Sequence, residues 1–570
     1  MHRTNIRRGL VVSIAMGAAV LGASATQARA SSPLDFSLTN ISSFAGEPSI
    51  TSAPDGTLYA ASLLALQPLR SPDGASGWSP GKNLDGTGDD CVATDQAGSL
   101  YMCNLAGSQS NAPLQADVWK TKDPHDDAGA TWIYGNNPIN VGGNQCGTDC
   151  NPFGVDRPWV DASIPANGTT DNAVVALMYH DFYGPSRIWV NISTNGGASF
   201  GLPIDVQANF TIPNGVAGAA VAAADSACNT IPAGVAIAKG GPHVGRIYVA
   251  WEAADPQSLG TGCNISEQQP FHNLIVAWSD NNGSTWTPQL AIDLGEAHDA
   301  ATPFVAFTLD NQGNPYIAYD ADPGFSPASC APPDSAGGCP TNSNSEYDTY
   351  VVWSSDGGPN WDGGTGLVPG SAASAYKVNA DTGTHQFPAI AAGDPGKVDV
   401  AYLGTPSFED VFPNGKLDNT AGGCGAGGPN VPAQGCTWSL WIGQSLNLTQ
   451  PVATATFTHL NATSTPMHVG DICDVGIACL GGRNLADFIM GTVSPTTGCF
   501  HVAYADDHVA NAVRSADQLG GPSIIGTGDC GQPLAVETAE AAWAGLLVPA
   551  ALVAGGAAWA LRRRRNTRTD

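Results

Sequence analysis

The sequence predicts an all-β protein folded as a seven-bladed β-propeller, followed by one transmembrane helix near the C-terminus. Three observations support this prediction. A short phrase recurs seven times, a second signature follows the phrase in several units, and turn-forming residues are abundant, with 69 glycines and 41 prolines in 570 residues. A six-bladed ring also fits the sequence if one terminal unit is a decoration of the ring.

The recurring phrase is a turn residue followed by a run of β-branched and aromatic residues. Such a run predicts a strand that leaves a tight turn. Repetition at intervals of tens of residues indicates a repeat architecture, and all-β repeats of this kind are typical of propeller blades. The copies lie at 56–61, 98–103, 173–179, 245–251, 313–319, 396–402 and 498–504.

Another predicted strand precedes most copies, and it begins near a proline, as at 47–50, 157–160 and 387–391. Proline suits the first residue of a strand because it has no N–H group to pair there. The turn to the recurring strand carries Asp and Gly signals, so the two strands form a hairpin. A third strand follows after a variable insertion, and we expect four strands in each unit.

The second signature follows the third strand and reads Ser-Asp-Asn-Asn-Gly-Ser-Thr-Trp at 279–286, with related versions at 193–200, 354–361 and 127–132. We expect Asp or Asn to cap the turn, Gly to take the positive φ angle, and the aromatic residue to pack between strands. These structural positions are Ser193, Asn195, Gly197, Phe200, Ser279, Asn281, Gly283, Trp286, Ser354, Asp356, Gly358, Trp361, Asp127, Gly129 and Trp132.

These turns resemble the Asp-box, or BNR repeat, of the sialidase-like β-propeller superfamily, and the resemblance covers about residues 46–521. In that superfamily the box lies on the face opposite the active site, so the resemblance implies a structural role for it. The resemblance also implies an exo-α-sialidase-like glycoside hydrolase, which uses three arginines, a Tyr–Glu nucleophile pair and an Asp acid/base. The chain departs from that pattern, because Glu-Pro-Ser-Ile at 47–50 stands where the family has Arg-Ile-Pro.

The tyrosines of the recurring phrase also depart from a catalytic pattern. Tyr319, Tyr402 and Tyr504 occupy the same slot as Trp251 in their repeats. A residue type that recurs in blade after blade is expected to pack in the core rather than to act as a unique nucleophile. The enzyme assignment therefore stays open.

The chain of a blade alternates between the two faces of a propeller, which lets us place the loops. The long insertions are predicted on the face opposite the Asp-boxes, at 137–155, 206–230, 253–272, 320–347, 404–437 and 465–484. Most of the 14 cysteines are also expected there. An even number of cysteines in an exported chain predicts disulfides. Pairing between neighbours would join Cys91–Cys103, Cys146–Cys150, Cys228–Cys263, Cys330–Cys339, Cys424–Cys436, Cys473–Cys479 and Cys499–Cys530.

The starts of the inner strands place mostly acidic residues at the mouth of the central channel on the face with the insertions. Crowded carboxylates bind a cation, share protons, or act as general acid and base, and they also cap strand entrances in contact with solvent. The candidate ligand-binding residues are Glu47, Asp90, Asp156, Arg157, Asp299, His385, Arg483 and Asp487. No cofactor is firmly implied, and a divalent cation such as calcium is one candidate ligand.

Both ends of the chain carry targeting signals. Residues 1–30 have a basic start, an apolar stretch and Ala-Arg-Ala, which predicts a signal peptide for the general secretory or the twin-arginine route. Residues 541–561 are apolar and long enough to cross a bilayer, and the arginine-rich residues 562–570 should stay in the cytoplasm. Residues 31–45 and 522–540 are then an N-terminal segment and a linker.

The formal net charge of −28 disfavours nucleic acid and anionic membrane surfaces as partners, because both require cationic surfaces. We expect a single-pass protein of a prokaryotic envelope with its propeller outside the cell. The leading functional hypothesis is a recognition or adhesion module for a glycan or a protein. The sialidase-like hydrolase and a purely structural envelope protein are the alternatives.

Overall fold

The structure is a computed structural model, and it describes eighteen stretches of the chain, called the described residues below. They are 32–43, 46–63, 65–84, 88–106, 115–126, 129–135, 155–181, 187–207, 230–254, 271–293, 304–321, 347–361, 375–406, 416–417, 436–449, 454–470, 472–473 and 484–530. Within these residues the regular structure is β, apart from the short 3-10 helix η2 (Thr170–Asn172).

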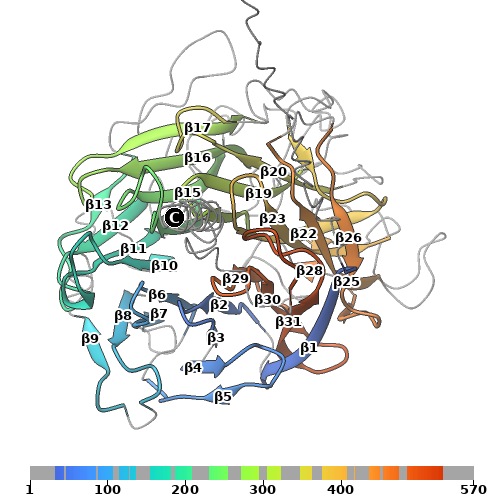
Figure 1. Cartoon of the computed structure of the whole chain (residues 1–570), viewed down its shortest axis with the longest axis horizontal. Helices are drawn as coiled ribbons and strands as arrows, with labels where there is room; N and C mark the ends of the chain where they lie inside the picture. Colours follow the sequence, from blue (N-terminus) through green and yellow to red (C-terminus); the bar gives the residue numbers. More distant parts are fainter. Residues whose placement is uncertain are drawn as a thin grey trace, which may run out of the picture.

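Seven sheets of four or five strands surround a central axis, so the predicted seven-bladed propeller is confirmed (Figure 1). Blades one to six begin at the axis and add their main strands outward in chain order. Blade one holds β2 (Ser49–Ser52), β3 (Leu58–Ser62), β4 (Ala65–Ser71) and β5 (Ser79–Pro80). Blade two holds β6 (Asp90–Thr94), β7 (Leu100–Ala106), β8 (Gln115–Thr121) and β9 (Ile133–Gly135). Blade three holds β10 (Val155–Ser163), β11 (Val174–Asp181), β12 (Ile188–Ser193) and β13 (Ile204–Asp205).

Blades four to six repeat this order. Blade four holds β14 (Thr230–Ile237), β15 (Ile247–Ala254), β16 (Phe271–Ser279) and β17 (Thr287–Asp293). Blade five holds β18 (Ala306–Leu309), β19 (Pro315–Ala321), β20 (Asp348–Trp353) and β21 (Tyr376–Lys377). Blade six holds β22 (Thr384–Ala392), β23 (Val398–Thr405), β25 (Thr437–Ser445) and β26 (Thr458–Asn461), with β27 (His468–Val469) also paired to β25. A separate ribbon joins β24 (Lys416–Leu417) to β28 (Ile472–Cys473).

The recurring phrase of the sequence forms the second strand of every blade: β3, β7, β11, β15, β19, β23 and β30. These strands are buried because neighbouring blades cover both of their faces, which explains their nearly continuous apolar sequence. Tyr319, Tyr402 and Tyr504 are each at most 1% exposed, so their predicted role in packing is confirmed. The core of the molecule thus lies between the blades rather than on the axis.

Blade seven contains strands from both ends of the domain. It joins β29 (Met490–Val493), β30 (Phe500–Asp506) and β31 (Ala512–Gly520) to β1 (Asp35–Ser42), which pairs antiparallel with β31 along its outer edge. Residues 31–45 were predicted only as an N-terminal segment, with no strand. The propeller therefore begins before residue 46, and an N-terminal strand closes the ring.

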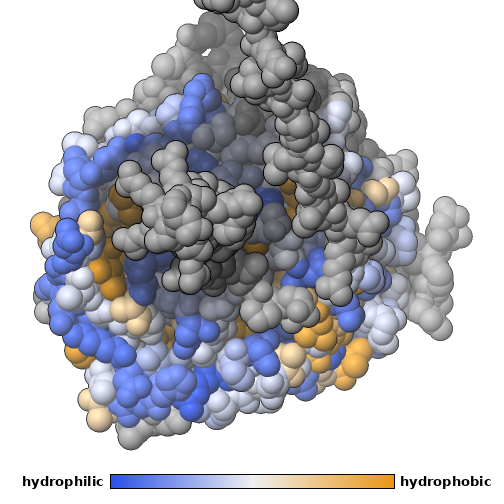
Figure 2. All heavy atoms as spheres, viewed as in Figure 1, coloured by the Kyte–Doolittle hydropathy of each residue, from blue (hydrophilic) through white to orange (hydrophobic). Residues whose placement is uncertain are grey.

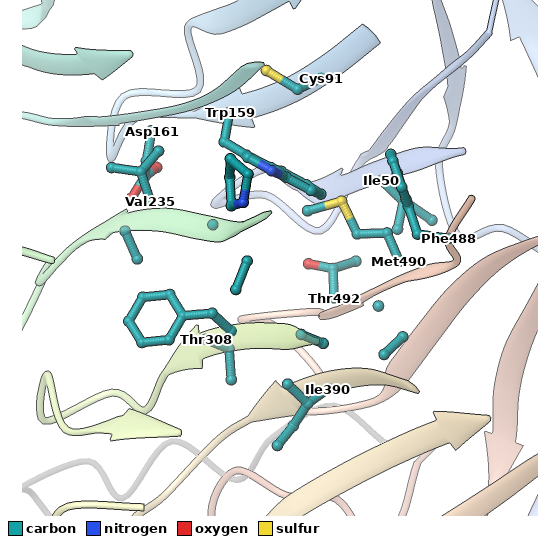
Figure 3. Close-up of a pocket in the computed structure, with 18 of the residues that line it drawn as sticks. Ile50, Cys91, Trp159, Asp161, Val235, Thr308, Ile390, Phe488, Met490 and Thr492 are labelled. Atoms are coloured by element: carbon teal, nitrogen blue, oxygen red, sulfur yellow. The ribbon is translucent and has the colours of Figure 1, made fainter. Parts of the chain in front are cut away.

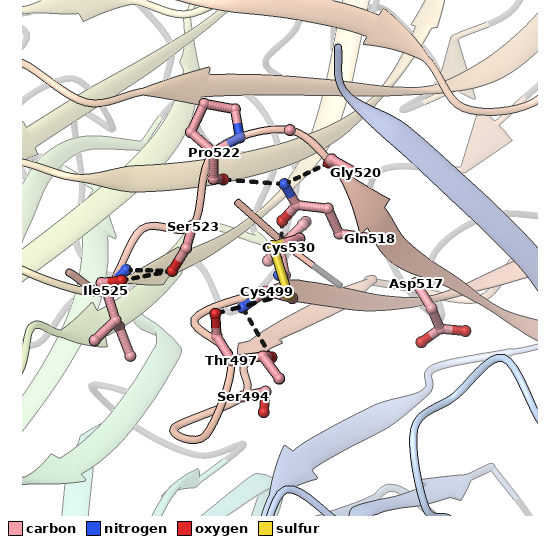
Figure 4. Close-up of a disulfide and its surroundings, with 12 residues drawn as sticks. Ser494, Thr497, Cys499, Asp517, Gln518, Gly520, Pro522, Ser523, Ile525 and Cys530 are labelled. Atoms are coloured by element: carbon pink, nitrogen blue, oxygen red, sulfur yellow. Dashed lines mark hydrogen bonds between the residues drawn. A yellow bond between two sulfur atoms is a disulfide. The ribbon is translucent and has the colours of Figure 1, made fainter. Parts of the chain in front are cut away.

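The chain continues to pack against the propeller after β31. The predicted disulfide Cys499–Cys530 is present, with the two Cα atoms 5.4 Å apart (Figure 4). Gly526 N–H donates to Asp394 of blade six at 2.8 Å, and Ile524 is fully buried. The first part of the expected linker at 522–540, up to Cys530, is thus a folded part of the domain.

The strand register defines the two ends of the channel. In each blade the first strand runs from one end of the propeller to a hairpin turn at the other, as at Ala53–Thr57 and Ser494–Cys499. We call the end with these hairpins the turn end, and the opposite end, where the first strands start, the mouth end. The strand ends that border the predicted insertions lie at the mouth end, whereas the insertions themselves fall largely outside the described residues.

Three turns at the turn end have the same hydrogen-bond pattern. In the turn after β16, Gly283 N–H donates to Ser279 Oγ at 2.9 Å, and Thr285 N–H donates to Asn281 Oδ1 at 2.9 Å. The turns after β12 and β20 repeat these bonds with Ser193, Asn195, Gly197 and Ser199, and with Ser354, Asp356, Gly358 and Asn360. The Ser–Asx geometry that the sequence predicted for these turns is therefore present. Of the weaker version, Gly129 and Trp132 are described, and Asp127 lies outside the described residues.

Several predictions concern the parts of the chain that the structure does not describe. The signal peptide at 1–30, the transmembrane helix at 541–561 and the tail at 562–570 all fall there. Within the described stretches, no helix is long and apolar enough to span a membrane. Hydrophilic side chains form much of the described surface on the face shown in Figure 2.

The predicted disulfide Cys91–Cys103 is also present and joins register partners on β6 and β7. Cys436 is disulfide-bonded as well. The remaining predicted pairs each include a cysteine outside the described residues, so these pairings stay predictions.

Candidate functional site

The inner strands enter the channel through strained backbone. Glu47, Arg157 and Phe387 each precede a proline and have positive φ angles of 37°, 49° and 56°. Positive φ is unfavourable for side chains other than glycine, and a following proline disfavours the right-handed helical alternative. The ladders of β10 and β22 are irregular at these positions. Bulges of this kind redirect side chains, and strain of about 1–3 kcal/mol per residue persists only where the surrounding structure holds it.

An ion pair crosses the mouth between blades three and seven. Arg157 Nη2 donates to Asp487 Oδ2 at 3.0 Å, and the two side chains are 5% and 11% exposed. The guanidinium carbon of Arg157 also lies 4.3 Å from the centre of the Phe304 ring. Phe304 meets Phe387 edge-on, with ring centres 5.2 Å apart. A charge-assisted hydrogen bond and a cation–π contact thus fix the guanidinium from two sides.

A row of carboxyl groups lies beside this ion pair. The Glu47 side chain is hydrogen-bonded to that of Asp89, which is in turn hydrogen-bonded to Asp156. Burial raises the pKa of Glu47 well above its usual range, and the negative charges of Asp89 and Asp487 raise it further, while Arg157 lowers it. Burial also raises the pKa of Asp89. Burial thus favours the protonated form of both Glu47 and Asp89.

A neutral histidine flanks the same row. His180 on β11 is the register partner of Asp156, and its Nδ1 lies 2.7 Å from the Thr230 carbonyl oxygen. A carbonyl oxygen only accepts, so the proton of the ring is on Nδ1. Burial, followed by the charge of Arg157, lowers the pKa of His180 to about 3. The histidine therefore adds no positive charge to the mouth.

A cavity of about 200 Å³ continues from the ion pair along the axis (Figure 3). Its lining is mainly apolar and includes Trp159, Phe304, Ile390, Phe488 and Met490, with Arg157 at the mouth end.

Polar groups line the cavity toward the turn end, where Thr51, Thr308, Thr492 and Asp161 lie. Asp161 is satisfied there by Lys239 Nζ at 2.9 Å and by the Ile237 N–H at 2.8 Å. The cavity is therefore apolar in the middle and polar at both ends.

The structure brings together four of the predicted site residues: Glu47, Asp156, Arg157 and Asp487. Asp90 follows Asp89 in the chain and is 2% exposed, and burial raises its pKa well above the usual range.

His385 contacts a different group. Its Nδ1 lies 3.0 Å from the Tyr347 carbonyl oxygen, and its Nε2 lies 3.1 Å from Asp381 Oδ1. Asp299 and Arg483 fall outside the described residues, so their places at the mouth stay predictions.

Sequence reasoning missed Asp89, His180 and the two phenylalanines. The repeat itself held the signal for Asp89, because Gly88-Asp89 in unit two matches Gly46-Glu47 in unit one, and both glycines have positive φ angles of 131° and 141°. The phenylalanines have no such signal, because an isolated aromatic residue is equally typical of a core position. In the described part of the chain, no three or more His, Cys, Asp and Glu side chains are grouped so that they could hold a metal ion.

Comparisons with known proteins give fold-level similarities only. No family model matches the sequence, and no curated protein matches it. A protein of unknown function from Dyadobacter fermentans is 12% identical with a TM-score of 0.34, covering 86% of this chain and 97% of its own. An ulvan lyase, from a family of polysaccharide lyases, is 13% identical with a TM-score of 0.41, covering 86% and 96%. The intramolecular trans-sialidase of Ruminococcus gnavus is 12% identical with a TM-score of 0.35, covering 83% and 94%. Similarities of this size carry no argument about what this chain binds.

Proposed function

We propose that this protein is a glycan-binding propeller that is displayed outside the cell and tethered by its predicted C-terminal helix. The observation that carries the proposal is the arginine and carboxyl cluster held on strained backbone at the mouth of the channel. Saccharide hydroxyls need acceptors and donors in fixed directions, which carboxylates and a guanidinium supply. The aromatic rings of Phe304 and Phe387 add an apolar surface next to these groups.

The charges at the mouth favour a neutral saccharide or an amino sugar. Arg157 is already neutralised by Asp487, and the other ionisable side chains described beside it, Glu47, Asp89 and Asp156, are carboxyl groups. A sugar carboxylate would face these groups at short range, and like charges disfavour one another. Sialic acids and uronic acids are therefore expected to bind less well than neutral glycans.

The proposal is tested with a glycan array that carries neutral, amino and acidic glycans, probed with the full-length protein. We expect binding to a neutral or amino-sugar glycan, and a loss of at least tenfold in affinity for Arg157→Ala. The matched control is Arg187→Ala, which removes an arginine of the outer strands that pairs with Asp205 at 2.9 Å. Denaturant unfolding of both variants confirms that each is folded. Unchanged glycan affinity in Arg157→Ala would refute this assignment of the site, and a protein that binds no glycan would favour a structural envelope role.

The raised pKa of Glu47 supports a second candidate, hydrolysis of a glycosidic bond. A carboxyl group with a raised pKa next to another carboxyl group is the arrangement that glycosidases use for a general acid and its partner. Glu47→Gln would then lower turnover of a panel of aryl glycosides by about 10²-fold or more while glycan binding persists. No turnover by the unmodified protein on any member of the panel removes this candidate and leaves the binding proposal standing.

A further inference from the structure

We infer that the channel below the mouth receives an apolar substituent, of up to about the size of a phenyl ring, carried by the saccharide that the mouth binds. This inference rests on the proposed function and extends it from the polar part of the ligand to its aglycone or acyl group. Its basis is the cavity along the axis, which Arg157 of the mouth also lines. Figure 3 shows other residues of the lining, among them Trp159, Phe488 and Met490.

The channel differs from the core of the molecule in its packing. The second strands of the blades are fully buried, whereas every residue of β29, including Met490 and Thr492, is only partly buried. The same holds for every residue of β18. Apolar side chains of the inner strands thus border open space, although protein interiors normally close such gaps because unfilled apolar volume is destabilising. An apolar group from a ligand would fill that space.

The size and the lining of the cavity fit an apolar group better than a cluster of waters. An engineered cavity of about 150 Å³ lined by Leu, Ile and Phe stays dry and binds benzene. The present cavity is about 200 Å³, and Trp159, Ile390, Phe488 and Met490 line its middle. Water enters a cavity when it finds two to four polar partners there. The polar side chains of the lining lie instead toward the two ends.

The mouth and the cavity are continuous through two residues. Arg157 belongs to both, because it pairs with Asp487 at the mouth and also lines the cavity. Phe304 likewise contacts the guanidinium and lines the cavity. The Trp159 indole N–H has no hydrogen-bond partner within the described part of the chain, although its nitrogen is buried.

The test compares methyl and phenyl β-glycosides of glucose, galactose and glucosamine, titrated calorimetrically into the full-length protein. If the phenyl group enters the channel, the phenyl member of a bound pair is expected to bind about tenfold more tightly than the methyl member. Thr492 lines the cavity, so Thr492→Phe should fill the channel and abolish this preference while the methyl glycoside still binds. Thr492→Val has nearly the same shape as the native side chain and should keep the preference.

Benzene alone serves as a second probe that needs no sugar. Saturable benzene binding by the native protein and by Thr492→Val, but not by Thr492→Phe, supports an open apolar channel. Equal affinities for methyl and phenyl glycosides, or a phenyl preference that survives in Thr492→Phe, would overturn the inference and leave the proposed function intact. If benzene binds in this pattern but none of the glycosides or array glycans binds, the proposed function fails, and with it the saccharide part of the inference.

Discussion

Asp399 occupies a slot of the recurring strand that holds a tyrosine in several other blades, such as Tyr59, Tyr248 and Tyr316. The Asp399 side chain is fully buried, and its Oδ1 accepts a hydrogen bond from Gln444 Nε2 at 2.9 Å. Burial raises the pKa of Asp399 to about 8, although the bond from Gln444 acts in the opposite direction. The folded protein therefore binds this proton more tightly than the unfolded chain does.

This proton makes the stability of the protein depend on pH. Between about pH 4 and about pH 8 the unfolded state has lost the proton of Asp399 and the folded state keeps it, so the free energy of unfolding falls as the pH rises through this window. We expect Asp399→Asn to flatten this slope and to be more stable than the native protein at pH 8 by a few kcal/mol. Urea unfolding at pH 5, 6.5 and 8 measures the effect. Asp35→Asn, at an exposed site, is the control, and parallel pH profiles of native protein and Asp399→Asn would contradict the prediction.

The residues of the candidate site show what sequence alone predicts at this scale. Glu47, Arg157 and Asp487 were found because strand starts in a propeller meet at one end of the axis, a rule of topology that needs no side-chain detail. The pairing of Arg157 with Asp487 was beyond such reasoning, because the two residues lie in blades three and seven and meet only when the ring closes. The same rule placed His385 on the first strand of blade six, where its ring contacts the Tyr347 carbonyl oxygen and Asp381.

Among the elements, the serine turns lie in close contact with the preceding blade. Gly358 has a φ angle of 122°, and a Cβ atom there would lie 2.9 Å from the Trp278 ring. Gly77 also has a positive φ angle, of 94°, but a Cβ atom there would meet nothing within 4 Å. Comparing substitutions at these two glycines therefore distinguishes the cost of backbone strain, present at both, from the cost of steric contact, present only at Gly358.

We expect Gly77→Ala to cost about 1 kcal/mol of unfolding free energy through strain alone, and Gly358→Ala to cost about 2–4 kcal/mol because strain and overpacking add. Both values come from urea unfolding at constant pH. Equal losses in the two variants would show that the contact with Trp278 is not tight.

The two disulfides of the described residues offer a second comparison between elements. Cys499–Cys530 spans 31 residues, and Cys91–Cys103 spans 12. A longer closed loop restricts the unfolded chain more, so replacing the first pair by alanine should cost about 4 kcal/mol and the second about 3 kcal/mol. Guanidinium unfolding of the two double variants gives the values. A larger loss for Cys91–Cys103 would mean that native-state packing, rather than chain entropy, dominates.

The elements were predicted unevenly from the sequence, for physical reasons. The second strands were found because burial on both faces makes them continuous apolar runs bounded by turns. Outer strands such as β5 and β13, which have two residues each, lie at exposed edges and carry no comparable pattern. β1 was missed because its partner is β31, at the far end of the domain, so nothing near it in the chain marks it as part of a blade.

For the whole molecule, the closure of the ring by β1 has a measurable consequence. Ile41 on β1 is 6% exposed and packs with Ile50, Ala60, Ala503 and Val513 of blades one and seven. Ile41→Ala is expected to destabilise the entire propeller by about 2–5 kcal/mol in a single cooperative transition. Leu519→Ala, at a site that is 48% exposed, should change stability by about 0.5 kcal/mol or less.

Thermal and denaturant unfolding, followed by tryptophan fluorescence and by circular dichroism, tests this prediction. Coincident transitions shifted together by Ile41→Ala support closure of the ring by the N-terminal strand. An early separate transition in which the other blades keep their native stability would show instead that β1 is only an appendage.

The disulfide between Cys499 and Cys530 also determines where a pulling force on the C-terminal end of the domain is applied. A force on the chain beyond residue 530 is transmitted through this disulfide to β30, which is an interior strand of blade seven. It does not act on the end of β31 at Gly520. The force therefore does not separate the paired strands β31 and β1 from their ends. Asp529 Oδ2 accepts a hydrogen bond from Ser32 N–H at 3.1 Å, so the entry and the exit of the chain are held together at the turn end. A pulling force at the C-terminal end of the domain thus acts on a covalent bond to an interior strand of blade seven. The mouth lies at the opposite end of the propeller.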